Sequence, residues 1–229
     1  MATDKIKIYK GTTPKGTFKY PRLTEPDFGN EDFPDPDGSY KLTLVMPQAQ
    51  AQKLIDQLQP EFDKAIELGQ EAFARLPVAN RKKLGEVKTQ DFYSEVYDKD
   101  SEEPTGEIEF KFRCKAGGTT KVGKPWSRTV ALFDAKGNPA KNIKEIWGGT
   151  EGKASFTTSP YFIAATGTAG LSLRLEAVQI LKLVVGGSRD AAGYGFGKED
   201  GDFDATEETQ GFVDETDSDD EAVDENEDF

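Results

Sequence analysis

Two stretches of this chain alternate apolar and polar residues too regularly for a helix. In EIEFKFRCK (Glu107–Lys115) the even-numbered positions from Ile108 to Cys114 are apolar. In LSLRLEA (Leu171–Ala177) the odd-numbered positions to Leu175 are leucines, and Arg174 lies between them. A period of two over this length indicates a strand with one buried and one solvated face. The chain therefore needs a β-sheet with a single apolar side.

Further strand candidates follow the same pattern. They are SYKLTLVM (39–46), SRTVALFD (127–134), GKASFTTS (152–159) and the shorter KIKIYK (5–10). The run VQILKLVV (178–185) extends Leu171–Ala177 with a change of buried face, which predicts a bulge. Turn signals separate these runs at PDPDG (34–38), KGNP (136–139) and GGT (148–150).

One segment has a different period. Between Gln48 and Leu76 the apolar residues recur every three or four positions, which predicts a helix with one core-facing stripe. Pro60 lies inside it and should kink the helix or split it in two. Several short strands with one inserted helix indicate a small antiparallel barrel or sandwich, and an OB-type barrel is one such fold. The periodicity alone does not choose between them.

The C-terminal part of the chain has another composition. Glu199–Phe229 holds 16 of the 42 acidic residues and no Lys or Arg, which leaves 26 acidic against 29 basic residues in Met1–Lys198. From about residue 187 glycines and charges replace aliphatic residues, so too little apolar surface can be buried to offset the ordering entropy. We expect a folded domain over 1–186 and a disordered linker and acidic tail over 187–229. A weakly basic body with an acidic tail indicates either nucleic-acid binding or a tail that interacts with other proteins.

Composition also argues against several kinds of site. The chain has no histidine and one cysteine, Cys114, which we expect to be a small buried residue. We therefore expect no catalytic residues, no metal site and no cofactor. The first residues have no apolar core of signal-peptide length, and no stretch approaches the roughly 20 apolar residues that span a bilayer. A cytoplasmic protein with no membrane partner is expected.

Two short motifs are weak matches to known sites. GTTKVGKP (118–125) resembles a phosphate-binding loop, but Pro125 replaces its hydroxyl residue and a strand follows where a helix is required. A hairpin loop carrying Lys121, Lys124 and Trp126 is the better interpretation. DGDFDATEETQG (200–211) begins like a calcium loop but lacks its central Gly and its final Glu.

Basic and aromatic residues combine as single-stranded nucleic acid binding requires, because cations follow the phosphates and rings stack on unpaired bases. Glu107 and Glu109 share the basic strand face, so a merely solvated face is the alternative. The candidate residues lie on several predicted strands and in the hairpin. They are Lys111, Arg113, Lys115, Arg128, Lys153, Trp126, Tyr161 and Phe162.

The chain ends in DSDDEAVDENEDF. Serial carboxylates resemble a polyanionic backbone and Phe229 resembles a base, so the tail could occupy the protein's own DNA groove or a basic site on a partner. A solubilising tail is the alternative. The residues that we expect to contact a partner are Asp219, Asp220, Glu221, Asp224, Glu225, Glu227, Asp228 and Phe229.

Five segments together resemble one protein family. They are PDFGNE (26–31), GSYKLTLVMP (38–47), FKFRC (110–114), SPYFIAATGTAGLSLRLEAVQILKL (159–183) and the closing EDF. In this order they resemble the acidic-tailed, OB-fold single-stranded DNA-binding proteins of short-tailed phages. The resemblance implies an OB barrel with an inserted helix and a location in the host cytoplasm. It also implies that the protein coats unpaired DNA in replication, recombination and repair.

The resemblance also implies roles for single residues. Lys111 and Arg113 match the basic strand of the family, and Tyr161 matches its stacking tyrosine. The tail would contact the replication DNA polymerase and the helicase-primase, and in the family it bears on dimer formation. A homodimer is one option here, and the oligomeric state stays open. Ile163 replaces a second aromatic residue, which leaves open whether Phe162 compensates, and Asp37 replaces a basic residue in a turn.

Two other classes of protein fit parts of the pattern. An acidic-tailed chaperone or DNA mimic would bind basic proteins and no DNA. A nucleic-acid enzyme would use clustered carboxylates and a metal, but the Asp and Glu residues of the body are scattered without metal-ligand spacing.

Overall fold

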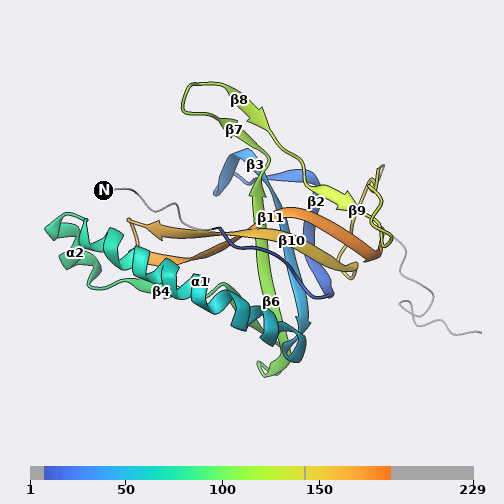
Figure 1. Ribbon diagram of the computed structural model, residues 1–229, viewed down its shortest axis with the longest axis horizontal. Helices are drawn as coiled ribbons and strands as arrows, with labels where there is room; N and C mark the ends of the chain where they lie inside the picture. The colour runs from blue at the N-terminus through green and yellow to red at the C-terminus, as the bar shows by residue number, and fades with distance from the viewer. Residues whose placement is uncertain (1–7, 142, 187–229) are drawn as a thin grey trace, which may run out of the picture. The chain divides into compact units, whose positions relative to one another are not determined.

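The computed structural model describes residues 8–141 and 143–186. Eleven strands and two helices follow one another along this part of the chain (Figure 1). They are β1 Lys10–Thr12, β2 Gly16–Gly29, β3 Pro34–Pro47, α1 Gln48–Ala74, α2 Val78–Leu84, β4 Lys88–Gln90, β5 Tyr93–Tyr97, β6 Pro104–Lys115, β7 Gly117–Thr119, β8 Pro125–Ser127, β9 Ala131–Phe133, β10 Glu151–Ile163 and β11 Thr168–Lys182.

Five long strands close into a barrel. The hydrogen-bonded order runs β10-β2-β3-β6-β11, and β11 pairs again with β10 to complete the ring. This is the mainly β, OB-type barrel with one inserted helix that the sequence predicts. Four of the five pairings are antiparallel, whereas β11 pairs with β6 in parallel at Leu173↔Phe112 and Arg174↔Arg113. Ring closure leaves none of the five long strands as a free edge over its whole length.

The barrel core comes from the alternation seen in the sequence. Phe110 and Phe112 of β6, Phe156 of β10 and Leu175 of β11 are at most 1% exposed. Cys114 is buried beside them, and its thiol pKa is raised by that burial. Phe133, which lies in the predicted strand 127–134, is only half-buried at the end of β9.

The predicted change of face on β11 is confirmed. Leu171, Leu173 and Leu175 are buried, and burial then passes to Val178 and Ile180. The pairing with β10 shifts register at this point, where Ser155 faces Ala177 but Phe156 faces Leu175. The unmatched residue is Glu176, so the bulge turns its carboxylate away from the core.

Helix α1 packs its apolar stripe against β10 and β11. Leu54, Leu58 and Phe62 are buried, and Gly69 lies so close to β11 that an added Cβ would be 2.3 Å from Ala169 Cβ. The prediction that Pro60 splits this helix is wrong. Pro60 lies on the solvent-exposed side, where water can take the place of the missing N–H donor.

Other boundaries differ from the sequence prediction. The 14-residue strand β2 was missed because Pro21 and Pro26 interrupt its pattern. PDPDG belongs to the start of β3, and its Gly38 takes φ +65°. The predicted strand 127–134 is divided, because β8 ends at Ser127 and β9 begins at Ala131.

Within the described residues no helix is long and apolar enough to cross a membrane. The first seven residues of the chain, which include half of the KIKIYK strand candidate, lie outside the described ranges. The predicted tail and the calcium-like segment 200–211 lie outside them as well. The division at 186/187 therefore stays a prediction.

Candidate nucleic-acid interface

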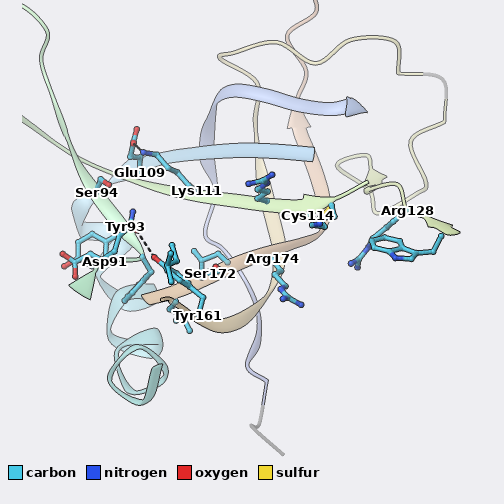
Figure 2. A pocket seen from close by; sticks show the side chains of 18 residues that line it. Asp91, Tyr93, Ser94, Glu109, Lys111, Cys114, Arg128, Tyr161, Ser172 and Arg174 are labelled. Atoms are coloured by element: carbon cyan, nitrogen blue, oxygen red, sulfur yellow. Dashed lines mark hydrogen bonds and ion pairs between the residues drawn. The ribbon is translucent and has the colours of Figure 1, made fainter. Parts of the chain in front are cut away.

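A groove of about 720 Å³ lies on the outer side of the barrel, lined by residues of β5, β6, β8, β10 and β11 (Figure 2). Figure 2 shows Tyr93, Tyr161 and Ser172 toward one end and Cys114 and Arg128 toward the other, with Arg174 between them. We call this the Tyr161 groove. It is the surface on which most of the predicted DNA-binding residues meet.

The cations of the Tyr161 groove come from strand alternation. Lys111, Arg113 and Lys115 project outward from β6 between buried neighbours, and each side chain is 57–71% exposed. Arg174 projects from β11 directly beside Arg113, since the parallel register pairs these two residues. Arg128 follows β8 in the connection to β9, with its backbone N–H donating to the Ala116 carbonyl at 2.7 Å.

Carboxylates pair with most of these cations. Arg113 contacts Asp35 at 2.6 Å, and Lys115 contacts Asp37 at 2.5 Å. Both aspartates lie on the first residues of β3, beside the end of β6. Arg128 pairs with Glu176, the bulge residue of β11. Within the described residues Arg174 makes no ion pair, so its guanidinium is the most available cation of the groove.

Glu109 ties two cations to the rim of the groove. Its carboxylate accepts from Lys19 at 3.1 Å and lies 3.1 Å from Lys111 Nζ. Partial burial alone would raise the Glu109 pKa, but the two lysines together hold the pKa below its ordinary value. Glu109 therefore stays charged at neutral pH and competes with phosphate for Lys19 and Lys111.

Four aromatic residues line the Tyr161 groove; Phe92 is buried, and the rings of Tyr161, Trp126 and Tyr93 are at least partly exposed. The Tyr161 hydroxyl donates to Gln90 Oε1 at 2.9 Å, and burial raises the pKa of this phenol. Trp126 is 40% exposed at the β7–β8 hairpin, and half-buried Tyr93 lies on β5. A ring held by a hydrogen bond or a strand offers a flat face at little cost in side-chain entropy, which suits base stacking.

Two predicted residues lie elsewhere. Phe162 does not line the Tyr161 groove and packs edge-on against Phe73 of α1, with ring centroids 6.5 Å apart. Strand alternation explains this, because Tyr161 and Ile163 face the groove and the residue between them faces the helix. Phe162 therefore does not replace the ring missing at Ile163. Lys153 is half-buried on β10 opposite Gln179, away from the groove lining.

The structure describes only one of the two weak motifs. GTTKVGKP forms the β7–β8 hairpin with no helix after it, as the hairpin interpretation predicts. In the described ranges no group of three or more acidic or cysteine side chains is placed to hold a metal ion. The tail residues Asp219–Phe229 lie outside these ranges.

The structure adds residues that the sequence analysis did not select. Arg174 was seen to point outward, yet only the β6–β11 register shows that it neighbours Arg113. Tyr93 lies in a short strand that pairs with β6 and has too few residues to show a period. Asp35 was not selected because the sequence PDPDG was interpreted as a turn. Its pKa is held low by the nearby Ser39 hydroxyl and by the Arg113 guanidinium.

The chain is similar to several phage proteins. Single-stranded DNA-binding proteins of Enterobacteria phage T3 and Escherichia phage T7 are 28% and 27% identical to it, over 92% and 75% of this chain and 90% and 75% of their own lengths. The crystal structure of gp2.5, a single-stranded DNA-binding protein encoded by bacteriophage T7, aligns with a TM-score of 0.62 at 26% identity. That alignment covers 81% of this chain and 95% of gp2.5.

A family model adds the strongest link. The model described as the single-stranded DNA-binding protein of bacteriophage T7 matches residues 15–183, which include all five barrel strands and α1. The chain therefore belongs to the family of the bacteriophage T7 single-stranded DNA-binding protein.

Proposed function

We propose that this protein binds single-stranded DNA without sequence preference and coats it during phage DNA replication, recombination and repair in the cytoplasm of the infected cell. One observation carries the proposal. The Tyr161 groove brings three partly exposed aromatic rings and five cations together on one outer face of an OB-type barrel. Rings supply stacking that every base can use, and cations follow the backbone, so neither contact reads sequence. The names of the relatives support the same function.

The proposed mechanism is binding without chemistry on the strand. Phosphates displace Asp35, Asp37 and Glu176 from their cations, while unpaired bases stack on Tyr161 and Trp126. Lys111, Arg113, Lys115, Arg128 and Arg174 then follow the backbone. Duplex DNA offers no unstacked base to the rings, so it gains only the phosphate contacts and binds more weakly.

The acidic segment Glu199–Phe229 is the second part of the proposal. Its 16 carboxylates would compete with DNA for the cations and, once displaced, dock the replication DNA polymerase and helicase-primase through Asp219–Phe229. The same segment would bear on the formation of a homodimer. Support comes from the charge division between body and tail and from the family to which the chain belongs.

A truncation tests the competition. Removing Glu199–Phe229 should tighten binding to a single-stranded oligonucleotide, most at low salt, because screening weakens ionic competition as salt rises. Fluorescence anisotropy at several salt concentrations measures this, and sedimentation of the same two proteins reports the oligomeric state. Equal or weaker binding after truncation would refute the competition.

An incubation of the protein and DNA with magnesium or manganese separates binding from cleavage, and intact DNA is the expected result.

A further inference from the structure

A second groove of about 690 Å³ lies between β2 and the segment that leads into β10. Two large aromatic side chains lie open on it: Tyr20 is 72% exposed and Trp147 is 51% exposed. Two exposed rings that line the same groove leave contiguous apolar area in water, which is a feature of ligand-binding grooves. We call this surface the Tyr20–Trp147 groove.

A strained backbone holds Tyr20 outward. Its φ of +50° lies in the left-handed region, which is rarely occupied by a residue with a bulky side chain. The pairing of β2 with β3 shifts register between Lys19 and Arg22, so Tyr20 lies in a bulge while Phe18 and Leu23 stay buried on either side. Bulges of this kind re-aim a side chain, and strain is kept where it serves a function.

Trp147 is fixed as well as exposed. Its backbone N–H donates to the Val184 carbonyl at 2.9 Å, and its indole N–H donates to Glu145 Oε2 at 2.9 Å. Gly186 lies so close to the indole that an added Cβ would be 2.2 Å from its ring. A ring held from several sides keeps one face available and loses little entropy when a ligand stacks on it.

The charge of this groove suits a polyanion. Lys19, Arg22 and Lys144 line it against two carboxylates, Glu25 and Glu145. Neither Arg22 nor Lys144 makes an ion pair within the described ranges, and the Lys19 ammonium lies 5.7 Å from the centroid of the Tyr20 ring. Cations beside exposed rings repeat the chemistry of the Tyr161 groove.

Cross-strand register joins the two grooves. Arg22 of β2 pairs with Lys41 of β3, Lys41 pairs with Arg113 of β6, and Arg113 pairs with Arg174 of β11. Directly paired residues share a sheet face, so these four cations form one row across the outside of the barrel, spaced at about 5 Å from strand to strand. Glu109 makes a second link, since it binds both Lys19 of one groove and Lys111 of the other.

We propose that the Tyr20–Trp147 groove is a second stacking site for the same DNA strand, which crosses the sheet along the row Arg22–Lys41–Arg113–Arg174. This inference rests on the proposed function, and it extends the bound strand over β3 and β2. Bases stack on Tyr20 and Trp147, and Arg22 and Lys144 contact phosphates at that end. The path needs one long single strand, so oligonucleotides of about 16 nucleotides, near the upper end for one OB fold, should fill it.

The two tryptophans of the chain make a direct test, because Trp126 lines one groove and Trp147 lines the other. In full-length Trp126→Phe the remaining indole is Trp147. Its emission should change in parallel with binding of oligo-dT of about 16 nucleotides, which the anisotropy of a labelled copy follows independently. Trp147→Ala should lower the affinity for this oligonucleotide about 5- to 150-fold, as expected for one lost stack.

Charge variants make the second arm. Arg22→Ala and Lys144→Ala should each reduce the magnitude of the salt slope by about 0.7, one phosphate contact on a single strand. Lys64→Ala, an exposed lysine on α1, is the matched control and should leave the slope unchanged.

The outcomes separate the two proposals. If the oligonucleotide binds without a change in Trp147 emission, the proposal of a second stacking site is overturned. An unchanged salt slope in both charge variants would overturn it as well. If the emission of Trp126 in the Trp147→Phe variant changes on oligonucleotide binding in the same experiments, single-strand binding in the Tyr161 groove still holds. If the labelled oligonucleotide does not bind the full-length protein at all, the proposed function itself fails.

Discussion

The Tyr161 groove and the Tyr20–Trp147 groove use the same side-chain chemistry with different electrostatics. In the first, carboxylates of β3, β6 and β11 already hold Lys111, Arg113, Lys115 and Arg128. In the second, Arg22 and Lys144 have no ion-pair partner within the described residues. DNA must therefore displace more internal anions in the first groove than in the second, although Arg174 of the first makes no ion pair within the described residues and Lys19 of the second is held by Glu109. The internal anions of the Tyr161 groove lower its affinity for DNA but leave its aromatic rings available for stacking.

The largest effect should come from the core beneath the Tyr161 groove, on β6. Phe112→Ala removes a buried ring that packs 5.4 Å from Phe156, centroid to centroid. The free energy of unfolding should fall by about 3–5 kcal/mol, as for other Phe→Ala core changes. Because Lys111 and Arg113 flank this residue on the outer face, the Tyr161 groove should lose binding at the same time. Urea denaturation measures the free energy of unfolding. A Phe112→Ala variant as stable as the parent would contradict the importance of this core contact.

A stacking variant separates the grooves. Tyr161→Ala should weaken single-strand binding by about 1–3 kcal/mol with little change in the salt slope, because it removes a stack and no charge. Tyr161→Phe is the control, since it keeps the ring and loses only the hydrogen bond to Gln90. Anisotropy titrations give both quantities. Equal losses in the two variants would place the effect in the hydrogen bond and contradict stacking.

A charge variant sharpens the same contrast. Lys111→Ala combined with Arg113→Ala should reduce the salt slope by about 1.4, two phosphate contacts at about 0.7 each. The affinity should fall less than two free cations would suggest, because Glu109 and Asp35 already occupy them. A salt titration from low to moderate ionic strength measures the slope. A parental slope would mean that neither residue contacts phosphate.

The smallest effect should be a gain in affinity for single-stranded DNA. Asp35→Asn with Asp37→Asn frees Arg113 and Lys115, and affinity for single strands should rise by about 0.2–1 kcal/mol per released pair. The Asp35 pKa lies below its ordinary value, so the competing charge persists at neutral pH. It is lost only as pH falls through that lowered pKa. The parent should therefore approach the affinity of the variant only in acid. An advantage of the variant that disappears by pH 6 would contradict this assignment.

The two grooves also differ in how far sequence could predict them. Strand alternation around Phe110 and Phe112 was enough to place Lys111, Arg113 and Lys115 on one face, because a period of two leaves no other arrangement. Register could not be derived in the same way. Arg174 meets Arg113 only through the parallel β6–β11 pair. Phe162 of β10 packs against Phe73 of α1, and this contact shows only once the fold places the two faces of β10.

The Tyr20–Trp147 groove shows the same limit more strongly. Pro21 and Pro26 disguise β2, and the bulge at Tyr20 appears only when Lys19 and Arg22 are paired with β3. The other long strands of the barrel were predictable because they are periodic, but their periodicity fitted a barrel and a sandwich equally, and the family resemblance was needed to favour the barrel. A site that depends on a bulge and on an irregular connection carries no periodic signal, so sequence reasoning passed over it.

One measurement tests the central claim most directly. The full-length protein is titrated with a single-stranded oligonucleotide and with a duplex of the same sequence at moderate ionic strength. Stacking on exposed rings predicts clear preference for the single strand, and the preference should shrink in Tyr161→Ala. Equal affinity for both ligands, or tighter binding to the duplex, would contradict a surface built to hold unpaired bases.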